Sequence, residues 1–209
     1  MSALPHIYLA SSSPRRSELL RQIGVQFDVL VFRVGENAGG RGEDADVDET
    51  PQPDESADRY VERMALTKAA AGVRRLLWRK LPRQPVLAAD TVVEIDGQII
   101  RKPANLDDAR AILWHLSGRD HHVLTAVAIS DGQKIRSKLS TNDVRFRTLS
   151  EDEISRYLAS GEPIDKAGAY AIQGHAATFI EEIRGSYSGI MGLPLFETAA
   201  LLEIFGYPL

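Results

Sequence analysis

Residues 11–16 read Ser-Ser-Ser-Pro-Arg-Arg, so only Pro14 separates three hydroxyl side chains from two guanidinium groups. Ser13 is a typical helix N-cap and Pro14 a typical first helical residue, which predicts a helix N-terminus with free backbone N–H groups. Such an N-terminus binds anions, whereas Arg15 and Arg16 oppose the helix dipole unless an anion compensates them. The segment therefore indicates a phosphate site, although a capped helix with solvated arginines explains the same residues.

Asp90 directly follows the apolar run 86–89, which predicts a buried strand that ends at this carboxylate. In such a place a carboxylate stays ionised only beside a cation, hydrogen-bond donors or open solvent. An aspartate that bonds a turn is the alternative, but Thr91, Lys102 and the arginines of residues 11–16 could converge on the same point. Asp90 is therefore the strongest single candidate for a catalytic group.

Two lysines could neutralise a bound anion. Lys68 falls in the apolar stripe of a predicted helix, where a lysine commonly extends its stem along the core and its head into water. Its ammonium could instead face inward and act on a triphosphate as a point charge. Lys102, which precedes Pro103, allows the same two interpretations, and a surface loop is the simpler one.

Two further segments are compatible with a site without requiring one. Residues 161–174 combine several glycines with apolar residues, which indicates either close approach of the backbone to a ligand or a tight structural corner. The acidic run at residues 44–49 is typical of a solvated loop. Neither segment assigns a function by itself.

The elements that must position these residues alternate between helix and strand. Strands are predicted over residues 6–10, 27–34, 86–89, 92–95, 98–100, 121–129, 134–147 and 178–183. Helices are predicted over residues 14–23, 56–78, 105–116 and 150–160, and again from residue 194 onward. Asp-Gly pairs at residues 96–97 and 131–132 predict hairpins among the strands. This order indicates an α/β fold with a mixed, twisted sheet and flanking helices.

Length and composition limit the possible domain organisation, partners and location of the protein. A chain of 209 residues is expected to form a single domain, 1–209, with two lobes around a central cleft, and residues 35–55 predict a mobile loop. A net charge of −4 argues against a nucleic acid polymer as partner, and the absence of cysteine excludes disulfide and zinc-thiolate chemistry. With no signal peptide and no apolar run of membrane-spanning length, the expected location is cytoplasmic.

The absence of several known motifs limits the reactions that the chain is expected to catalyse. The chain has no P-loop, no Gly-x-Gly-x-x-Gly, no Gly-x-Ser-x-Gly and no His-Glu-x-x-His motif. Its five histidines are scattered apart from His121 and His122, and strand alternation would send these two rings to opposite faces. A histidine metal site is therefore not expected.

The joint order of these motifs resembles the Maf family over nearly the whole chain. The resemblance is carried by residues 9–16 (LASSSPRR), 46–49 (DVDE), 65–69 around Lys68, 89–93 (ADTVV), 102–103 (KP), 116–118 (LSG) and 161–174. It implies hydrolysis of a nucleoside triphosphate to the monophosphate and pyrophosphate, with a divalent cation, Mg²⁺ or Mn²⁺, in a cleft between two lobes. The fold it implies is the mixed α/β fold of Maf and inosine-triphosphatase-like proteins.

The resemblance also implies roles for individual positions. Asp90 corresponds to the proton acceptor, and Glu49 and Asp90 to the metal-binding carboxylates. Substrate binding is assigned by the same resemblance to Ser11, Arg15, Arg16, Lys68, Thr91, Lys102 and Gln173. The chain departs from the family pattern at residues 35–45, which look like an insertion ahead of Glu49.

Details of residues 161–174 favour one branch of the family. Residues 165–166 (DK) and 172–174 (IQG) resemble the branch that acts on dTTP and UTP, whereas the sister branch acts on 7-methyl-GTP. Two alternatives stay open: a nucleotide-binding regulator of septum formation, and a 7-methyl-GTP pyrophosphatase. A homodimer is a further expectation from the family, with the nucleoside triphosphate as the main partner.

Overall fold

The computed structural model describes residues 6–30, 47–207 and 209, and these are built around one seven-stranded mixed sheet. Its strand order is β2-β1-β3-β5-β6-β7, with β4 paired to β3 off this path. The pairs β1–β2 and β1–β3 are parallel and the others antiparallel. The strands are β1 (His6–Leu9), β2 (Gln26–Val29), β3 (Val86–Ile95), β4 (Gln98–Ile100), β5 (Asp120–Ser130), β6 (Ile135–Phe146) and β7 (Ile180–Arg184). The predicted mixed α/β sheet is confirmed.

Helices flank this sheet on both faces. They are α1 (Pro14–Gln22), α2 (Ala57–Trp78), α3 (Leu106–Leu116), α4 (Glu151–Ala159), α5 (Tyr187–Met191) and α6 (Leu195–Ile204), with 3-10 turns η1 (Ala167–Ala169) and η2 (His175–Phe179). Asn105 caps α3, and Ser150 with Glu153 forms a capping box at α4, as the sequence predicts. The short α5 was not predicted, because five residues carry too little periodicity to reveal a helix.

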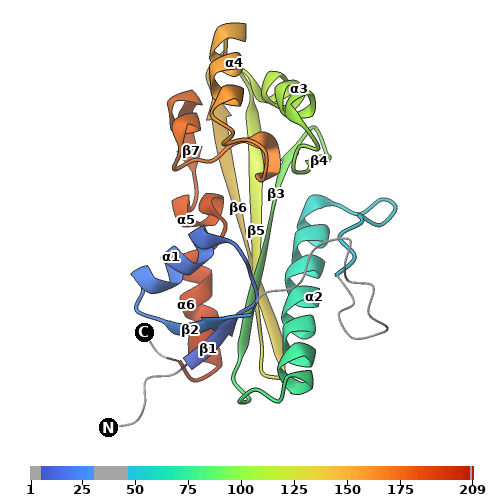
Figure 1. The fold of residues 1–209 in the computed structure, drawn as a ribbon, viewed down its shortest axis with the longest axis vertical. Helices are drawn as coiled ribbons and strands as arrows, with labels where there is room; N and C mark the ends of the chain where they lie inside the picture. Colours follow the sequence, from blue (N-terminus) through green and yellow to red (C-terminus); the bar gives the residue numbers. More distant parts are fainter. Residues whose placement is uncertain (1–5, 31–46, 208) are drawn as a thin grey trace.

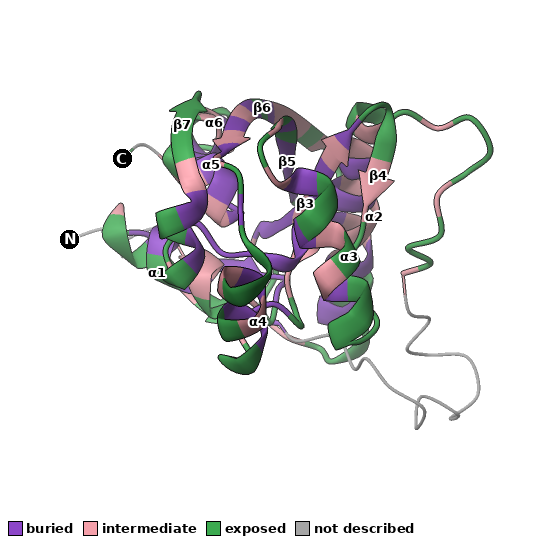
Figure 2. Ribbon diagram, turned by 90° about the horizontal axis from the view of Figure 1, so that it is seen from above, coloured by how far each residue is buried: buried purple, intermediate pink, exposed green. Residues whose placement is uncertain are grey.

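The long strands β3, β5 and β6 run through two lobes (Figure 1). In the α2 lobe, α2 covers one face of the sheet and α1 and α6 cover the other, each with its own apolar cluster. In the α4 lobe, a third cluster joins α3 and α4 to the far ends of the same strands. Figure 2 shows the buried strands enclosed by helices whose outer surfaces are exposed. All three apolar clusters therefore pack on one sheet.

The prediction that a strand ends at Asp90 is wrong, because β3 continues without interruption to Ile95. Asp90 and Thr91 pair with Ala126 and Thr125 of β5 like the residues around them. Only the burial changes: residues 86–89 are buried, Asp90 and Thr91 are partly buried, and burial resumes at Val92. The carboxylate thus lies where the strand leaves one lobe and enters the other.

Several predicted boundaries also shift. The strand predicted over residues 27–34 ends at Val29, and residues 31–46 lie outside the described part of the chain. The last strand begins at Ile180, because residues 175–179 form η2. Residues 47–55 form neither helix nor strand, and the predicted mobility of residues 35–55 stays a prediction. Within the described ranges, no helix is long and apolar enough to cross a membrane.

Candidate active site

The edge of β3 is open at the junction between the lobes. β1 pairs with β3 at Val86 and Leu87, and β4 pairs with it from Val93 to Ile95. Among the described residues, the stretch 88–92 therefore has no strand partner on this edge. Because main-chain groups left unpaired by a sheet need other partners, this opening is suited to a polar ligand.

On the α2 side of the opening, Lys68 lies between two carboxylates. Its Nζ is 2.6 Å from Asp90 Oδ1 and 2.7 Å from Glu49 Oε1. The side chains of Lys68 and Asp90 are only 15% and 13% exposed, whereas that of Glu49 is 51% exposed. The Lys68 ammonium therefore faces inward, and the alternative of a lysine extended into solvent does not describe it. We call Glu49, Lys68 and Asp90 the Lys68 cluster.

Two further cations act on this cluster. Burial by itself would raise the pKa of Glu49, but the Lys68 ammonium together with Lys102 and Arg101 outweighs burial and lowers this pKa. Glu49 is consequently held below its usual pKa and stays ionised at neutral pH. Lys102 is exposed, so it lies at the edge of the site rather than inside it. Arg101 was not predicted as a site residue.

Tyr60 is a second residue that sequence reasoning missed. Its hydroxyl donates to the backbone carbonyl of Glu49 over 2.9 Å, which fastens the segment after residue 46 to helix α2. Burial, followed by the carboxylates of Asp90 and Glu49, raises the pKa of Tyr60 to about 12. The phenol is therefore a neutral donor at physiological pH. One tyrosine on a helical apolar stripe carries no signal that distinguishes it from ordinary core.

On the opposite face of β3, Thr91 lies beside Arg16. The guanidinium donates from Nε to the Gly192 carbonyl (2.8 Å), from Nη1 to Ser11 Oγ (3.2 Å) and from Nη2 to Thr91 Oγ1 (3.3 Å). Ser13 occupies the N-cap of α1, but its side chain makes no capping bond; instead its backbone N–H donates to Ser11 Oγ. Ser11 Oγ thus accepts from both the Ser13 backbone N–H and the Arg16 guanidinium, and no described side chain caps α1.

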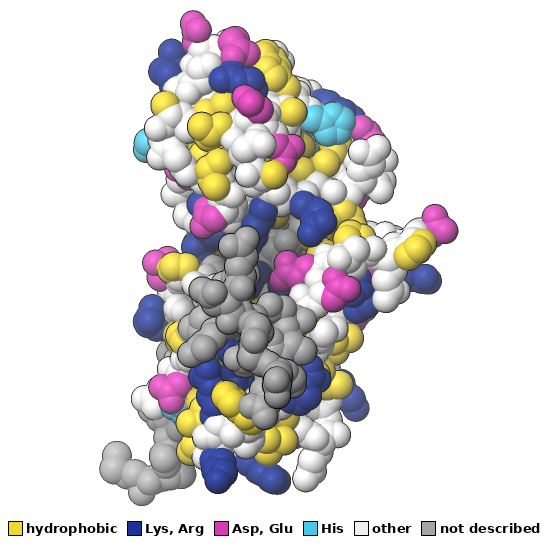
Figure 3. Space-filling view, turned by 45° about the vertical axis from the view of Figure 1, so that its right-hand side comes forward, with side chains coloured by type: hydrophobic (Ala, Val, Ile, Leu, Met, Phe, Trp, Pro, Cys, Tyr) yellow, Lys and Arg dark blue, Asp and Glu magenta, His cyan; other side chains and the backbone are white. Residues whose placement is uncertain are grey.

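Electrostatics joins the two faces into one site. Burial lowers the pKa of Arg16, while Asp90 and Glu49 raise it and Arg15 lowers it. An arginine stays protonated under such a shift, so a half-buried positive charge lies near the carboxylates of the Lys68 cluster. Figure 3 shows Lys and Arg side chains gathered where the molecule narrows between its lobes.

Residues 161–174 reach this region through Asp165. The pKa of Asp165 is lowered chiefly by its hydrogen bond with Lys166, and Arg15 contributes to the lowering. Gln173 is exposed and makes no hydrogen bond to the other described residues. The geometry therefore places Gln173 in the predicted segment without bringing it into contact with the other candidates.

Two glycines of this segment serve tight packing. At Gly168, where φ is +70°, a Cβ would lie 2.7 Å from Val93 Cγ2, and at Gly174 a Cβ would overlap the Glu162 carboxylate. Glu162 in turn accepts hydrogen bonds from the Tyr157 hydroxyl and from the His175 backbone N–H. At these two positions the structural explanation accounts for the glycines.

The Lys68 cluster also fits a divalent cation. Two carboxylates already converge on a single ammonium, and Mg²⁺ in nucleotide sites is commonly held by one or two carboxylates together with phosphate oxygens and water. In the described parts of the chain there is no group of three or more His, Cys, Asp or Glu side chains that could hold a metal. A cation bound by Glu49 and Asp90 would thus complete its coordination with phosphate oxygens or water.

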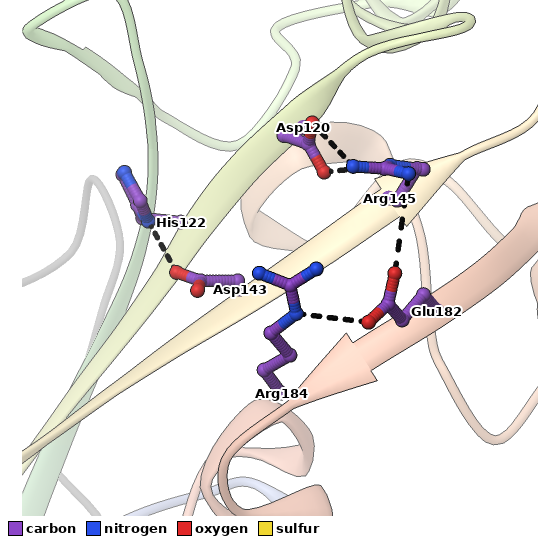
Figure 4. A pocket seen from close by; sticks show the side chains of 6 residues that line it. All are labelled: Asp120, His122, Asp143, Arg145, Glu182 and Arg184. Atoms are coloured by element: carbon purple, nitrogen blue, oxygen red, sulfur yellow. Dashed lines mark hydrogen bonds and ion pairs between the residues drawn. The ribbon is translucent and has the colours of Figure 1, made fainter.

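A second cluster of charges lies on the exposed face of β5, β6 and β7, away from these residues (Figure 4). Arg145 binds Asp120 through two hydrogen bonds of 2.9 and 3.1 Å, and Arg184 binds Glu182 over 2.8 Å. We call the residues lining this hollow the surface network: Asp120, His122, Asp143, Arg145, Glu182 and Arg184. Its cations are already paired with its carboxylates.

The chain is similar to known proteins over nearly its whole length. The family model described as Maf-like protein matches residues 6–205. A protein named dTTP/UTP pyrophosphatase from Aromatoleum aromaticum is 70% identical over 203 residues, covering 97% of each chain. The protein of the same name from Burkholderia lata is 56% identical over 201 residues, covering 95% of this chain and 92% of the relative.

Among solved structures, the Ham1 protein of Staphylococcus aureus aligns with a TM-score of 0.48 and 14% identity. The alignment covers 96% of this chain and 97% of that one. A similarity of this degree is too low to bear on the site.

Proposed function

The chain belongs to the Maf family, and we propose that it hydrolyses dTTP and UTP to the nucleoside monophosphate and pyrophosphate. The observation that carries this proposal is the inward-facing Lys68 between Asp90 and Glu49, with Arg16 held nearby on the other face of the same strand. Close relatives bear the name dTTP/UTP pyrophosphatase, which supports the proposed substrates.

In this proposal the positively charged side chains of the site bind the triphosphate. Acceptors in the described residues use three of the five N–H groups of Arg16, and the other two can donate to phosphate oxygens. Lys68 can transfer its ammonium from the carboxylates to the phosphates when the nucleotide enters. Arg15, Lys102 and Ser11 border the same place, so we assign them to substrate binding.

Asp90 is the proposed proton acceptor. Its Oδ1 accepts from Lys68, and no described residue donates to Oδ2, so that oxygen is free to orient a water molecule. The water oxygen forms a bond with the α-phosphorus, the bond from that phosphorus to the bridging oxygen of the β-phosphate breaks, and pyrophosphate leaves. Asp90 takes the proton of the attacking water and passes it to solvent.

Glu49 and Asp90 would hold a divalent cation, Mg²⁺ or Mn²⁺, together with phosphate oxygens. When bound, such a cation supplies charge neutralisation at the triphosphate. Glu49 is fastened for this role through Tyr60, which fixes its backbone, and through Lys68, which fixes its carboxylate. Cation binding at this pair is part of the proposal.

Recognition of the base is assigned to Gln173, with Arg15 and Thr91. The exposed amide of Gln173 offers one acceptor and two donors, which match the N3–H and carbonyl groups of thymine or uracil. Guanine presents a larger ring with a different edge, and unpaired polar groups are the strongest source of discrimination.

The test is a nucleotide panel of dTTP, UTP and 7-methyl-GTP with added Mg²⁺ or Mn²⁺, in which pyrophosphate and phosphate are measured separately. We expect pyrophosphate release from dTTP and UTP with a higher kcat/KM than from 7-methyl-GTP. Preference for 7-methyl-GTP would move the protein to the sister branch. Tight nucleotide binding without turnover would favour a regulatory protein. The cytoplasmic location, the absence of a nucleic acid partner and the homodimer stay predictions.

A further inference from the structure

A row of hydrogen bonds continues from Arg16 through β3 into β5. Arg16 Nη2 donates to Thr91 Oγ1, Thr91 Oγ1 lies 2.9 Å from Thr125 Oγ1, and Thr125 Oγ1 donates to the Gly189 carbonyl over 2.7 Å. Thr91 and Thr125 are cross-strand partners of β3 and β5, and Thr125 is fully buried. The row thus connects a half-buried guanidinium to the interior of the sheet.

The chemistry of the end groups fixes the direction of every bond in the row. A carbonyl can only accept, so the single hydroxyl hydrogen of Thr125 points to Gly189. The contact between the two threonines therefore requires Thr91 to donate and Thr125 to accept. With its hydrogen directed inward, Thr91 presents only lone pairs to Arg16.

The acceptors at the far side belong to helix α5. The Gly189 carbonyl, within α5, accepts from Thr125 Oγ1. The Gly192 carbonyl, just after the end of α5, accepts from Arg16 Nε. Helix α5 is itself seated on β6, because Asn142 Oδ1 accepts from the Ser186 backbone N–H over 2.6 Å. Arg16 is thereby held both directly by a carbonyl after α5 and indirectly through the two threonines.

We propose that Thr125 is a positioning residue for the active site, which holds Thr91 with its hydrogen directed inward and so fixes the Arg16 guanidinium for the triphosphate. This inference rests on the proposed function and extends it to a buried residue that does not touch the substrate. Thr125 reaches the substrate only through Thr91 and Arg16. A guanidinium held at three N–H groups keeps its remaining donors in one orientation, which favours binding and reaction geometry.

The two substitutions that separate this role from ordinary packing are Thr125→Val and Thr125→Ser. Valine has nearly the shape of threonine but no hydroxyl, so Thr91 loses its acceptor and its hydrogen can turn toward Arg16. Gly189 keeps a donor, since the Gly192 backbone N–H also reaches its carbonyl over 3.0 Å. Serine keeps the hydroxyl and removes only a methyl group.

The experiment measures kcat and KM for UTP with Mg²⁺, together with melting temperature, for the full-length variants. We expect Thr125→Val to lower kcat/KM by about tenfold or more, and Thr125→Ser to stay near the unmodified protein. Ser130→Ala is the matched control: Ser130 carries a buried hydroxyl on the same strand, and among the described residues this hydroxyl bonds only the Gly132 backbone N–H. Its kinetics should not change.

A double substitution tests whether Thr125 acts through Arg16. If it does, Arg16→Ala with Thr125→Val should be no slower than Arg16→Ala alone, whereas independent structural damage would multiply the two losses. Equal kcat/KM for the valine variant and the unmodified protein, equal impairment of the valine and serine variants, or multiplied losses would each overturn the proposal.

Binding of inorganic tripolyphosphate, measured by calorimetry, separates this inference from the proposed function. If the unmodified protein hydrolyses neither dTTP nor UTP, the proposed function fails, yet Thr125→Val should still bind tripolyphosphate more weakly than Thr125→Ser does. Equal affinities for both variants and the unmodified protein would overturn the positioning role by itself.

Discussion

The Lys68 cluster and the surface network are both made of closely spaced opposite charges, but their surroundings differ. Lys68 and Asp90 are 15% and 13% exposed, and one ammonium serves two carboxylates. In the surface network, Arg145 and Asp120 are 43% and 62% exposed, and Glu182 pairs with both Arg145 and Arg184. Figure 4 shows Arg145 pairing with Asp120 and Glu182 on the neighbouring strands, whereas Arg184 and Glu182 lie on the same strand, β7.

This difference in exposure separates charges that can act on a ligand from charges that contribute little to the stability of the fold. Water and salt screen an exposed pair, and measured surface ion pairs contribute little to stability. A half-buried cation is screened less, and an incoming phosphate can replace one of its carboxylates as partner. The cations of the surface network are exposed and already paired with carboxylates, so water screens their attraction to a ligand.

The largest effect is expected from Asp90→Asn. The amide keeps the shape of the side chain but accepts no proton, so kcat/KM should fall by about 10²–10⁴-fold. Folding should be retained, because Lys68 keeps Glu49 as partner. The measurement is pyrophosphate release from UTP with excess Mg²⁺, together with the melting temperature. Activity close to that of the unmodified protein would remove Asp90 from the mechanism.

Lys68→Ala should lower kcat/KM on the order of 10²-fold, because the triphosphate loses a positioned cation and two carboxylates lose their shared partner. Lys134→Ala provides the control: Lys134 donates to the Ile204 carbonyl and lies over the Phe205 ring. If Lys68→Ala melts much earlier while its kinetics stay normal, the lysine is structural.

Burial also changes how a histidine, His121, titrates. His121 is buried against Tyr170 and Phe146, and burial lowers its pKa from 6.5 to about 4. Between these pH values the unfolded chain binds more protons than the folded one, so stability is lost as the pH falls from 6.5 through 4. The expected loss is on the order of 3 kcal/mol.

Denaturant unfolding at pH 7 and pH 4.5 measures this loss. His121→Gln should reduce the pH dependence, because it removes the buried imidazole whose pKa burial lowers. Identical pH dependence in His121→Gln and the unmodified protein would mean that His121 does not carry the effect.

The smallest effect on activity and stability is expected from Arg145→Ala, which removes the ion pairs of Arg145 in the surface network. Because Arg145 and its partners Asp120 and Glu182 are exposed, kcat/KM for UTP should stay within about twofold and the melting temperature close to that of the unmodified protein. A loss of activity comparable to that of Lys68→Ala would assign the surface network a role that its exposure does not support.

Local signals in the sequence located most elements but not all of their ends. The Asp-Gly turns at residues 96–97 and 131–132 and the caps at Asn105 and Ser150 depend on neighbouring residues, and all were predicted correctly. The end of the strand at Asp90 was not, because a polar residue at a junction between two lobes gives the same local pattern as a strand end.

The sequence by itself determined the mixed α/β class, the family and the residue types of the candidate site, since periodicity, turns and motif order are properties of short segments. Only the tertiary structure decided which of those residues meet. Lys68 faces Asp90 because α2 packs on one face of β3, and Arg16 reaches Gly192, 176 positions away, because α1 and α5 share the other. Tyr60 and Thr125 acquired their contacts in the same way, from a sheet that brings distant segments within hydrogen-bond distance.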